Sequence, residues 1–282
     1  MAVRTIGVDA GGTLVKIAYE TEDGEIQTLK MRSDRLDEAA QRLVRLSGND
    51  SSLCRIALTG GKAEALRGKL RLAAIVLPEF EATSAGIRWL LRRRGEDRRK
   101  FLLTNVGTGT SIHAIDGLSH VRLGGTGIGG GTLVGLSAML TGISDFDEIV
   151  RLASRGDRSR IDLSVSHIYE GAAPPIPGEL TASNFGRWLA TGGSDRKEDI
   201  LASVVGMVGE TVASVSVHAA AQCGASCVLY IGSSFVGNDP LRQVVAGYTE
   251  LRGSRAVMVP DGEFSGAYGA LLAAAGKMPD MF

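Results

Sequence analysis

Short apolar runs and longer segments of helical periodicity alternate along the chain, and their order occurs twice. In the first series, Asp23-Gly24 joins two apolar runs, and an Asp-Gly turn is a strong hairpin signal. The helical segment that follows keeps its apolar residues on one face. The elements predicted for this series are strands at 3–9, 14–20, 25–31, 54–59 and 72–77 and helices at 35–46 and 81–94.

The second series begins at about residue 101 and again starts with three strands joined by tight turns. Its predicted strands are 101–106, 111–116, 119–123, 226–231 and 255–259, and its helices are 131–141, 145–154, 197–222, 239–250 and 264–275, with a less regular stretch to about 180. The two series predict an α/β protein with a duplicated topology. This layout resembles the ribonuclease-H-like lobes of the actin and hexokinase superfamily. The resemblance implies an N-terminal lobe at 1–100, a C-terminal lobe at 101–282 and a nucleotide cleft between them.

The first turn carries the clearest chemical signal of the chain. A strand ends at Asp9, Gly11 and Gly12 turn the chain, and Thr13 and Lys16 follow. Glycines let backbone N–H groups approach a ligand closely, and successive N–H groups in such a turn form an anion-binding concavity. Asp9 is a candidate metal ligand, and Thr13 and Lys16 can reach phosphate oxygens. An ordinary Gly-Gly hairpin is the alternative interpretation of the turn alone.

A second glycine-threonine turn, at 107–110, stands at the same place in the second series, and a glycine run follows at 124–131. The run feeds a helix that starts near Thr132, and backbone amides at a helix N-terminus suit phosphate. The run also matches the spacing of a dinucleotide fingerprint. That interpretation fails because the required strand-turn-helix-strand unit with a terminal acid is missing. A flexible loop remains the alternative.

Two charged residues are candidates for catalysis. Glu79 follows a predicted strand at a helix start, where it either stabilises the helix dipole or accepts a proton from an attacking hydroxyl. Arg122 precedes the glycine run and either lies on a strand surface or stabilises developing charge on a phosphoryl group. Ser233 and the segment 262–269 follow later strands, where they serve as helix caps or contact adenosine.

The bulk properties exclude several classes. The 31 basic and 31 acidic residues cancel, so no electrostatic footprint for nucleic acid is present. No apolar stretch is both long and charge-free enough to predict a membrane span, and no signal peptide is expected. The three cysteines lack zinc spacing and indicate a reducing compartment. The four histidines are scattered, and no chemistry is assigned to them.

Together these motifs resemble the bacterial type II pantothenate kinases. The resemblance covers roughly residues 4–273, and the Pro-Pro-Ile-Pro-Gly segment has no generic nucleotide-binding explanation. The segments that carry it are 7–16, 78–82, 105–111, 122–131, 156–158, 161–163, 167–169, 174–178, 180–186, 230–235 and 264–267.

The resemblance implies ATP-dependent phosphorylation of pantothenate, the first step toward coenzyme A. It implies that Glu79 is the general base on the pantoyl hydroxyl, that Arg122 contacts pantothenate and the phosphoryl region, and that Mg²⁺ accompanies ATP at Asp9. Phe146 falls where the family often has tyrosine near adenine, which keeps stacking but loses a hydroxyl. The positions matching the ATP site are Asp9, Ala10, Gly11, Gly12, Thr13, Leu14, Val15, Lys16, Thr108, Gly130, Gly131, Thr132, Leu133, Val134, Phe146 and Ser233.

The resemblance further implies a cytoplasmic homodimer in which Thr181 and Tyr248 line the pantothenate pocket of the neighbouring subunit. The predicted helix at 197–222 is rich in Val, Ala, Gly and Ser and can be buried all round, which suits a dimer helix or an internal core helix equally. Three other functions remain open: a sugar or N-acetylglucosamine kinase of the same fold, a non-metabolic actin-like ATPase, and a catalytically silent sensor of pantothenate or coenzyme A.

Overall fold

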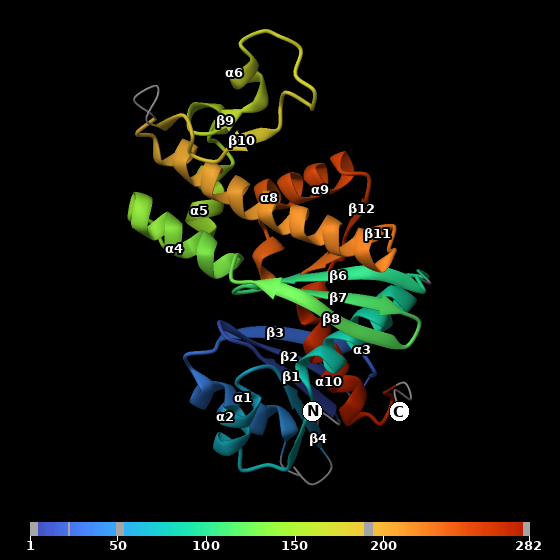
Figure 1. The fold of residues 1–282 in the computed structure, drawn as a ribbon. Coiled ribbons are helices and arrows are strands. Elements are labelled where there is room, and N and C mark those ends of the chain that lie inside the picture. Colours follow the sequence, from blue (N-terminus) through green and yellow to red (C-terminus); the bar gives the residue numbers. More distant parts are fainter. Residues whose placement is uncertain (1–4, 22, 49–53, 97, 189–193, 279–282) are drawn as a thin grey trace. The chain divides into compact units, whose positions relative to one another are not determined.

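The structure is a computed structural model that describes residues 5–21, 23–48, 54–96, 98–188 and 194–278 (Figure 1). Its contacts divide the chain into two compact units. The first unit comprises residues 1–101, 113–122 and 259–282, and the second comprises 102–112 and 123–258. The prediction from the sequence put residues 259–282 in the C-terminal lobe. The structure groups these residues with the first unit instead, because the last helix packs on the first strand.

The first unit is built on a five-stranded sheet of order β3-β2-β1-β4-β5, in which β1 pairs antiparallel with β2 and parallel with β4. Its elements are β1 (Thr5–Ala10), β2 (Leu14–Glu20), β3 (Ile26–Arg32), α1 (Leu36–Ser47), β4 (Arg55–Thr59), α2 (Ala63–Lys69), β5 (Ala74–Val76), α3 (Glu79–Arg93) and α10 (Ser265–Ala274).

The two faces of this sheet follow the alternation of its strand residues. Ile6 and Val8 pack with α1 and α2 in one hydrophobic core. Gly7 and Ala57 face the opposite side, where α10 covers the sheet (Figure 1). The approach is so close that a Cβ added to Gly7 would lie 2.1 Å from the backbone nitrogen of Leu271.

Helices α3 and α10 pack backbone to backbone through glycines. A Cβ on Gly86 would lie 1.8 Å from the carbonyl oxygen of Ser265, and a Cβ on Gly269 would lie 1.8 Å from that of Ala82. Since only hydrogen fits at these contacts, the two glycines fix the position of α3. The first residue of α3 is Glu79, two residues earlier than the sequence predicted.

Most of a second sheet, of order β12-β11-β6-β7-β8, belongs to the second unit, and residues 113–122 of its β7-β8 hairpin are assigned to the first unit. A small two-stranded sheet pairs β9 with β10. The elements are β6 (Lys100–Val106), β7 (Thr110–Asp116), β8 (Ser119–Thr126), α4 (Gly130–Thr141), α5 (Phe146–Ala153), β9 (Leu163–Ser164), α6 (Val165–Tyr169), β10 (Thr181–Ser183), α8 (Lys197–Cys223), β11 (Cys227–Ile231), α9 (Asp239–Leu251) and β12 (Arg255–Met258), with short 3-10 turns at Arg158–Arg160 and Ser233–Phe235.

Helix α8 forms the centre of the second unit. It packs against α4, α5 and α9 (Figure 1), and its buried residues Leu201, Val205 and Val212 belong to the main hydrophobic core. Among the described residues, α8 is the one helix whose length and composition would allow it to cross a membrane, and 78% of its apolar window is buried inside the structure. Burial on several sides is what a core helix requires, so the structure supports the interpretation of α8 as an internal core helix.

Candidate functional site

The predicted phosphate turn lies between β1 and β2 in the first unit. The N–H of Gly11 donates to the carbonyl of Leu14 at 3.0 Å and closes the turn. Ser33, which is 3% exposed and directly follows β3, holds the turn in place: its N–H donates to the carbonyl of Thr13 at 3.0 Å, and its hydroxyl donates to that of Gly12. Lys62 Nζ donates to the Ser33 hydroxyl at 2.9 Å. The turn is therefore fixed by a second layer of polar contacts that the sequence did not indicate.

Asp9 and Lys16 face each other across the β1-β2 pair. Their register pairs them directly, and Lys16 Nζ lies 3.5 Å from Asp9 Oδ2. A Cβ on Gly60 would lie 2.6 Å from Asp9 Oδ1, and one on Gly266 would lie 3.0 Å from Oδ2. Burial raises the pKa of Asp9, although the charge of Lys16 opposes the rise. The Asp9 side chain is 14% exposed, and a largely desolvated carboxylate that still reaches the surface favours a bound cation, as a metal ligand must.

Glu79 begins α3 directly after Pro78. Desolvation by the surrounding protein raises the pKa of Glu79, the negative charge of Asp9 raises it further, and Lys16 lowers it. The three charged groups are thus close enough to influence one another's ionisation. A carboxyl with a raised pKa is suited to accept a proton near neutral pH. The sequence-predicted residues Asp9, Lys16 and Glu79 therefore lie together in one unit.

Arg122 belongs to the same unit and contacts Phe80, the residue that follows Glu79. The guanidinium carbon of Arg122 lies 5.7 Å from the centroid of the Phe80 ring, in a cation–π contact. The ring of Phe80 also contacts His113, with centroids 4.7 Å apart. His113 and His120 are linked by a 2.9 Å contact between Nδ1 and Nε2. The prediction that the histidines are scattered was therefore wrong for this pair, because the β7-β8 hairpin brings them together.

The second glycine-threonine turn packs against the glycine run inside the second unit. The N–H of Gly130 donates to the carbonyl of Gly107 at 2.9 Å, and that of Gly131 donates to Thr108 at 2.8 Å. A Cβ on Gly129 would lie 2.8 Å from Gly109. The first amides of α4 thus hold the two segments together. This differs from the prediction that they point at a phosphate group.

Several residues matching the ATP site belong to the hydrophobic cores. Ala10, Val15 and Leu133 are 0% exposed as whole residues and pack inside the two cores. Leu14, Thr132 and Val134 are partly buried, and Phe146 at the start of α5 is also partly buried and packs on the main core of the second unit.

Ser233 lies in the 3-10 turn after β11. Its neighbour Ser234 is the residue whose hydroxyl donates to the carbonyl of Gly107 at 2.9 Å. The resemblance had pointed to Ser233 as the contact to the nucleotide, and that assignment stays a prediction.

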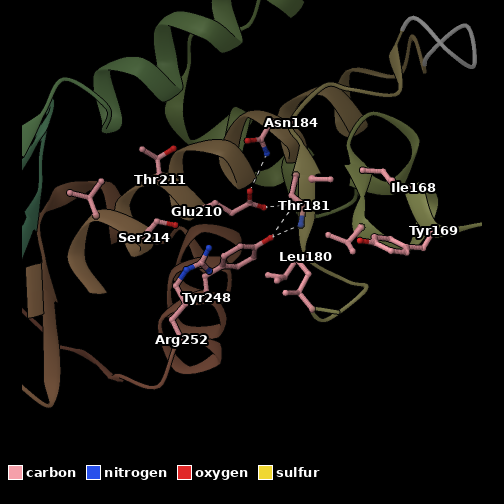
Figure 2. A pocket seen from close by; sticks show the side chains of 14 residues that line it. Ile168, Tyr169, Leu180, Thr181, Asn184, Glu210, Thr211, Ser214, Tyr248 and Arg252 are labelled. Atoms are coloured by element: carbon pink, nitrogen blue, oxygen red, sulfur yellow. Dashed lines mark hydrogen bonds between the residues drawn. The ribbon is translucent and has the colours of Figure 1, made fainter. Parts of the chain in front are cut away.

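A cavity of about 670 Å³ in the second unit contains the two remaining candidates, Thr181 and Tyr248 (Figure 2). The Tyr248 hydroxyl donates to Thr181 Oγ1 at 3.0 Å, and Thr181 Oγ1 donates to Glu210 Oε1 at 2.8 Å. Asn184 donates to the other oxygen of Glu210 at 3.2 Å. The polar wall of the cavity is thus a connected network, and its apolar wall includes Ile168 of α6 and Leu180, which precedes β10.

An arginine completes this network behind the cavity. Arg158 forms an ion pair with Glu210, and its Nε donates to Asp162 Oδ2 at 2.8 Å. Burial raises the pKa of Asp162, although Arg158 and a backbone hydrogen bond oppose the rise. A Cβ on Gly206 of α8 would lie 2.1 Å from the Arg158 guanidinium carbon. Glycine at this position leaves the space that the guanidinium fills.

Within the described part of the chain, no group of three or more histidine, cysteine, aspartate or glutamate side chains could hold a metal ion by itself. Mg²⁺ is usually held by one or two carboxylates together with substrate phosphates. Asp9 is a fit for that arrangement, because its carboxylate is buried beside the glycine turn.

Solved structures with the same architecture define the class of the protein. An activator of 2-hydroxyisocaproyl-CoA dehydratase from Clostridium difficile with bound ADPNP superposes with a TM-score of 0.64 at 15% identity, covering 97% of this chain and 95% of that one. A glucokinase of the ROK family from Streptomyces griseus, in complex with glucose and AMPPNP, gives a TM-score of 0.57 at 14% identity and covers 98% and 100%. The chain therefore has the actin-like ATPase fold, as predicted.

Sequence comparison gives the family. The Fumble family model matches residues 91–273. A type II pantothenate kinase of Bacillus cereus strain G9842 is 41% identical over 95% of this chain and 98% of its own length. One from Staphylococcus haemolyticus is 42% identical over 94% and 98%. The chain belongs to the type II pantothenate kinases, which confirms the resemblance read from its motifs.

Proposed function

We propose that this protein catalyses the ATP-dependent phosphorylation of pantothenate to 4'-phosphopantothenate, the first step of coenzyme A biosynthesis. Family membership along nearly the whole chain supports the reaction. The observation that carries the chemistry is the grouping of Glu79 with Asp9 and Lys16 in the first unit, where the pKa of Glu79 is raised.

In this proposal Glu79 is the general base. Its carboxylate takes the proton of the primary hydroxyl of pantothenate while that oxygen attacks the γ-phosphorus of ATP. The bond from the γ-phosphorus to the bridging oxygen breaks, and ADP leaves. Positioning of the reactants and stabilisation of the developing charge supply most of the acceleration in such a reaction. Lys16 and Arg122 carry the positive charges that this protein offers to the phosphoryl group.

Mg²⁺, when bound with ATP, would neutralise part of the negative charge of the phosphates. Asp9 is the residue that would hold it, since its carboxylate is buried next to Gly11 and Gly12. The paired Lys16 would then exchange part of its contact with Asp9 for phosphate oxygens, a role that its 3.5 Å separation from Asp9 permits.

We propose that the nucleotide is bound by both glycine-threonine turns. In the first unit the backbone from Asp9 to Lys16 contacts the phosphates. In the second unit Thr108, which is exposed, contacts them from the packed turn, and Gly130 to Val134 support it. Phe146 and Ser233 lie near adenosine in this proposal. The cleft between the lobes, in which the nucleotide would lie, stays a prediction.

Pantothenate is proposed to contact Arg122. Thr181 and Tyr248, which are hydrogen-bonded to each other, are proposed to line the pocket from a second copy of the chain in a cytoplasmic homodimer. We propose no nucleic-acid or membrane partner, in keeping with the balanced charge of the chain.

The experiment that tests the base compares Glu79→Gln with Glu81→Gln. Both residues are in the first turn of α3, so Glu81 is a matched control that changes the same charge near the same helix end. Loss of a general base costs about 10²–10⁴-fold in rate. We expect that loss of kcat in Glu79→Gln, with ATP binding retained, and near-normal kcat in Glu81→Gln. Equal turnover of the two variants would reject Glu79 as the base.

A further inference from the structure

A cluster of aromatic and basic side chains surrounds Arg122, and its other members have no role in the reaction as described. It consists of His113 and His120 from the β7-β8 hairpin, Phe80 and Arg88 from α3, and Arg122 from β8. All five belong to the first unit. Phe80 and Arg88 lie two turns apart on α3, so the hairpin packs along one side of this helix.

The hairpin geometry explains why these residues meet. Gly117 and Leu118 form a two-residue loop, so odd-numbered residues of β7 share a face of the hairpin with even-numbered residues of β8. His113, His120 and Arg122 therefore all face α3. Arg88 Nη2 donates to the carbonyl of Ser119 at 3.3 Å and ties the hairpin to the helix.

The contact between the two imidazoles constrains their protonation. A hydrogen bond between His113 Nδ1 and His120 Nε2 needs one N–H donor and one bare acceptor, so the two rings cannot both be protonated at these atoms. Burial lowers the pKa of His113 to about 4, and the charges of His120 and Arg122 contribute. Burial and the charge of Arg88 lower the pKa of His120. Both rings are thus neutral at pH 7, and the bond couples their tautomers, because one ring nitrogen must carry the hydrogen and the other must be bare.

The ring of Phe80 connects this pair to the reaction site. It lies 4.7 Å from His113 and 6.4 Å from His120 between centroids, and the guanidinium of Arg122 lies 5.7 Å from its centre. Phe80 is also the residue next to Glu79 in the first turn of α3. A rotation of the His113 ring would therefore displace the surface on which Arg122 rests and the turn that carries Glu79.

We propose that the hydrogen-bonded imidazole pair of His113 and His120 positions Arg122 and Glu79 for phosphoryl transfer, acting through the ring of Phe80. The inference rests on the proposed function, in which Arg122 and Glu79 contact the reactants. His113 and His120 are positioning residues in this account, because the contacts described for them are to Phe80 and to each other.

The pair also has a consequence for stability. The unfolded pKa of histidine is near 6.5 and that of folded His113 is about 4, so the unfolded chain binds more protons between these values. The neutral pair therefore contributes its full stability above about pH 6.5, and the contribution is lost as the pH falls toward about 4. The charged groups facing the pair, Arg88 and Arg122, are cationic throughout this range and oppose its protonation.

The test compares His120→Leu with His120→Gln and with the control His218→Leu. Leucine removes the hydrogen bond, whereas the glutamine amide places a polar group near the position of Nε2. His218 is exposed on α8, so its replacement controls for the loss of an imidazole. Steady-state kinetics give kcat and both KM values, and ¹³C-labelled histidine NMR gives the titration of His113 in each protein.

We expect His120→Leu to lower kcat about 3- to 10-fold, the effect of one hydrogen bond, with KM for ATP unchanged. His120→Gln should restore most of this loss, and His218→Leu should match the wild type. The titration of His113 should move upward, toward its ordinary range, in His120→Leu. If His120→Leu retains wild-type kcat, or if His120→Gln is as impaired as His120→Leu, the proposal is overturned.

Two further measurements test the proposal if His120→Leu does not fold, and separate its failure from failure of the proposed function. If His120→Leu does not fold, Phe80→Leu removes the connecting ring while leaving the imidazole pair in place. It should lower kcat to the same extent with the His113 titration unchanged, and a wild-type kcat would reject the proposal. A wild-type protein without pantothenate-dependent ADP release would instead contradict the proposed function itself.

Discussion

Replacement of Gly269 by alanine tests how the structure positions the start of α3. The added Cβ would lie 1.8 Å from the carbonyl oxygen and 2.5 Å from the carbonyl carbon of Ala82. Ordinary contacts between such atoms need about 3.5 Å, so α10 and α3 would have to separate by roughly 1.5 Å. Overpacking against backbone costs about 3 kcal/mol, and the higher helix propensity of alanine returns about 1 kcal/mol. The net destabilisation is about 2 kcal/mol.

The assay is thermal unfolding followed by circular dichroism, with kcat measured in parallel. For a chain of this size the net loss lowers Tm by about 4–8 °C. The matched control is Gly247→Ala, in the interior of α9, where a Cβ would meet no atom within 4 Å. This control should raise Tm slightly, by helix propensity alone. A Gly269→Ala protein as stable as the wild type, or shifts of the same sign in both variants, would refute the reasoning.

Three further predictions concern the polar groups of the site. The acid limb of the pH–rate profile should lie above the ordinary glutamate range, because the base must be ionised and the pKa of Glu79 is raised; a limb at the usual value would contradict this. Ser33→Ala should raise KM for ATP several-fold with KM for pantothenate unchanged, because Gly12 loses its hydrogen bond; an unchanged KM for ATP would separate this contact from nucleotide binding. Arg158→Met should lower the free energy of unfolding by about 3–5 kcal/mol in chemical denaturation, because Glu210 keeps its buried charge without a cationic partner, and the added change Glu210→Gln should recover part of this loss. No recovery in the double variant would show that the charge is not the cause.

The arrangement of strands and helices was predicted well from the sequence, because apolar periodicity and glycine turns report directly on local structure. The strand at 14–20 and the helix that starts at residue 239 agree with β2 and α9. The position of the last helix was not predictable in the same way. Its association with the first unit depends on Gly7, Gly86 and Gly269, which lie far apart in the sequence and become informative only once they face one another.

In the candidate site, too, the features that depend on local sequence were predicted, and those that depend on packing between distant segments were not. Asp9 lies near the end of β1, Lys16 near the start of the antiparallel β2 and Glu79 shortly after β5, and a sheet brings such positions to one edge. The imidazole pair was missed because His113 and His120 are seven residues apart, a spacing without a metal or catalytic signature. The two-residue turn between their strands was the available signal, since it puts both on one face. The amides of Gly130 and Gly131 donate to carbonyl groups of the 107–110 turn. These hydrogen bonds depend on the packing of two loops, which no local sequence pattern predicts.

The central claim is that this protein transfers a phosphoryl group from ATP to pantothenate. The most direct measurement is ADP release by the wild-type protein with pantothenate, pantetheine, glucose and N-acetylglucosamine side by side, with the phosphorylated product identified by mass spectrometry. The account predicts pantothenate-dependent ADP release and formation of 4'-phosphopantothenate, with no turnover of either sugar. Turnover of a sugar in place of pantothenate, or no release of ADP with pantothenate, would contradict it.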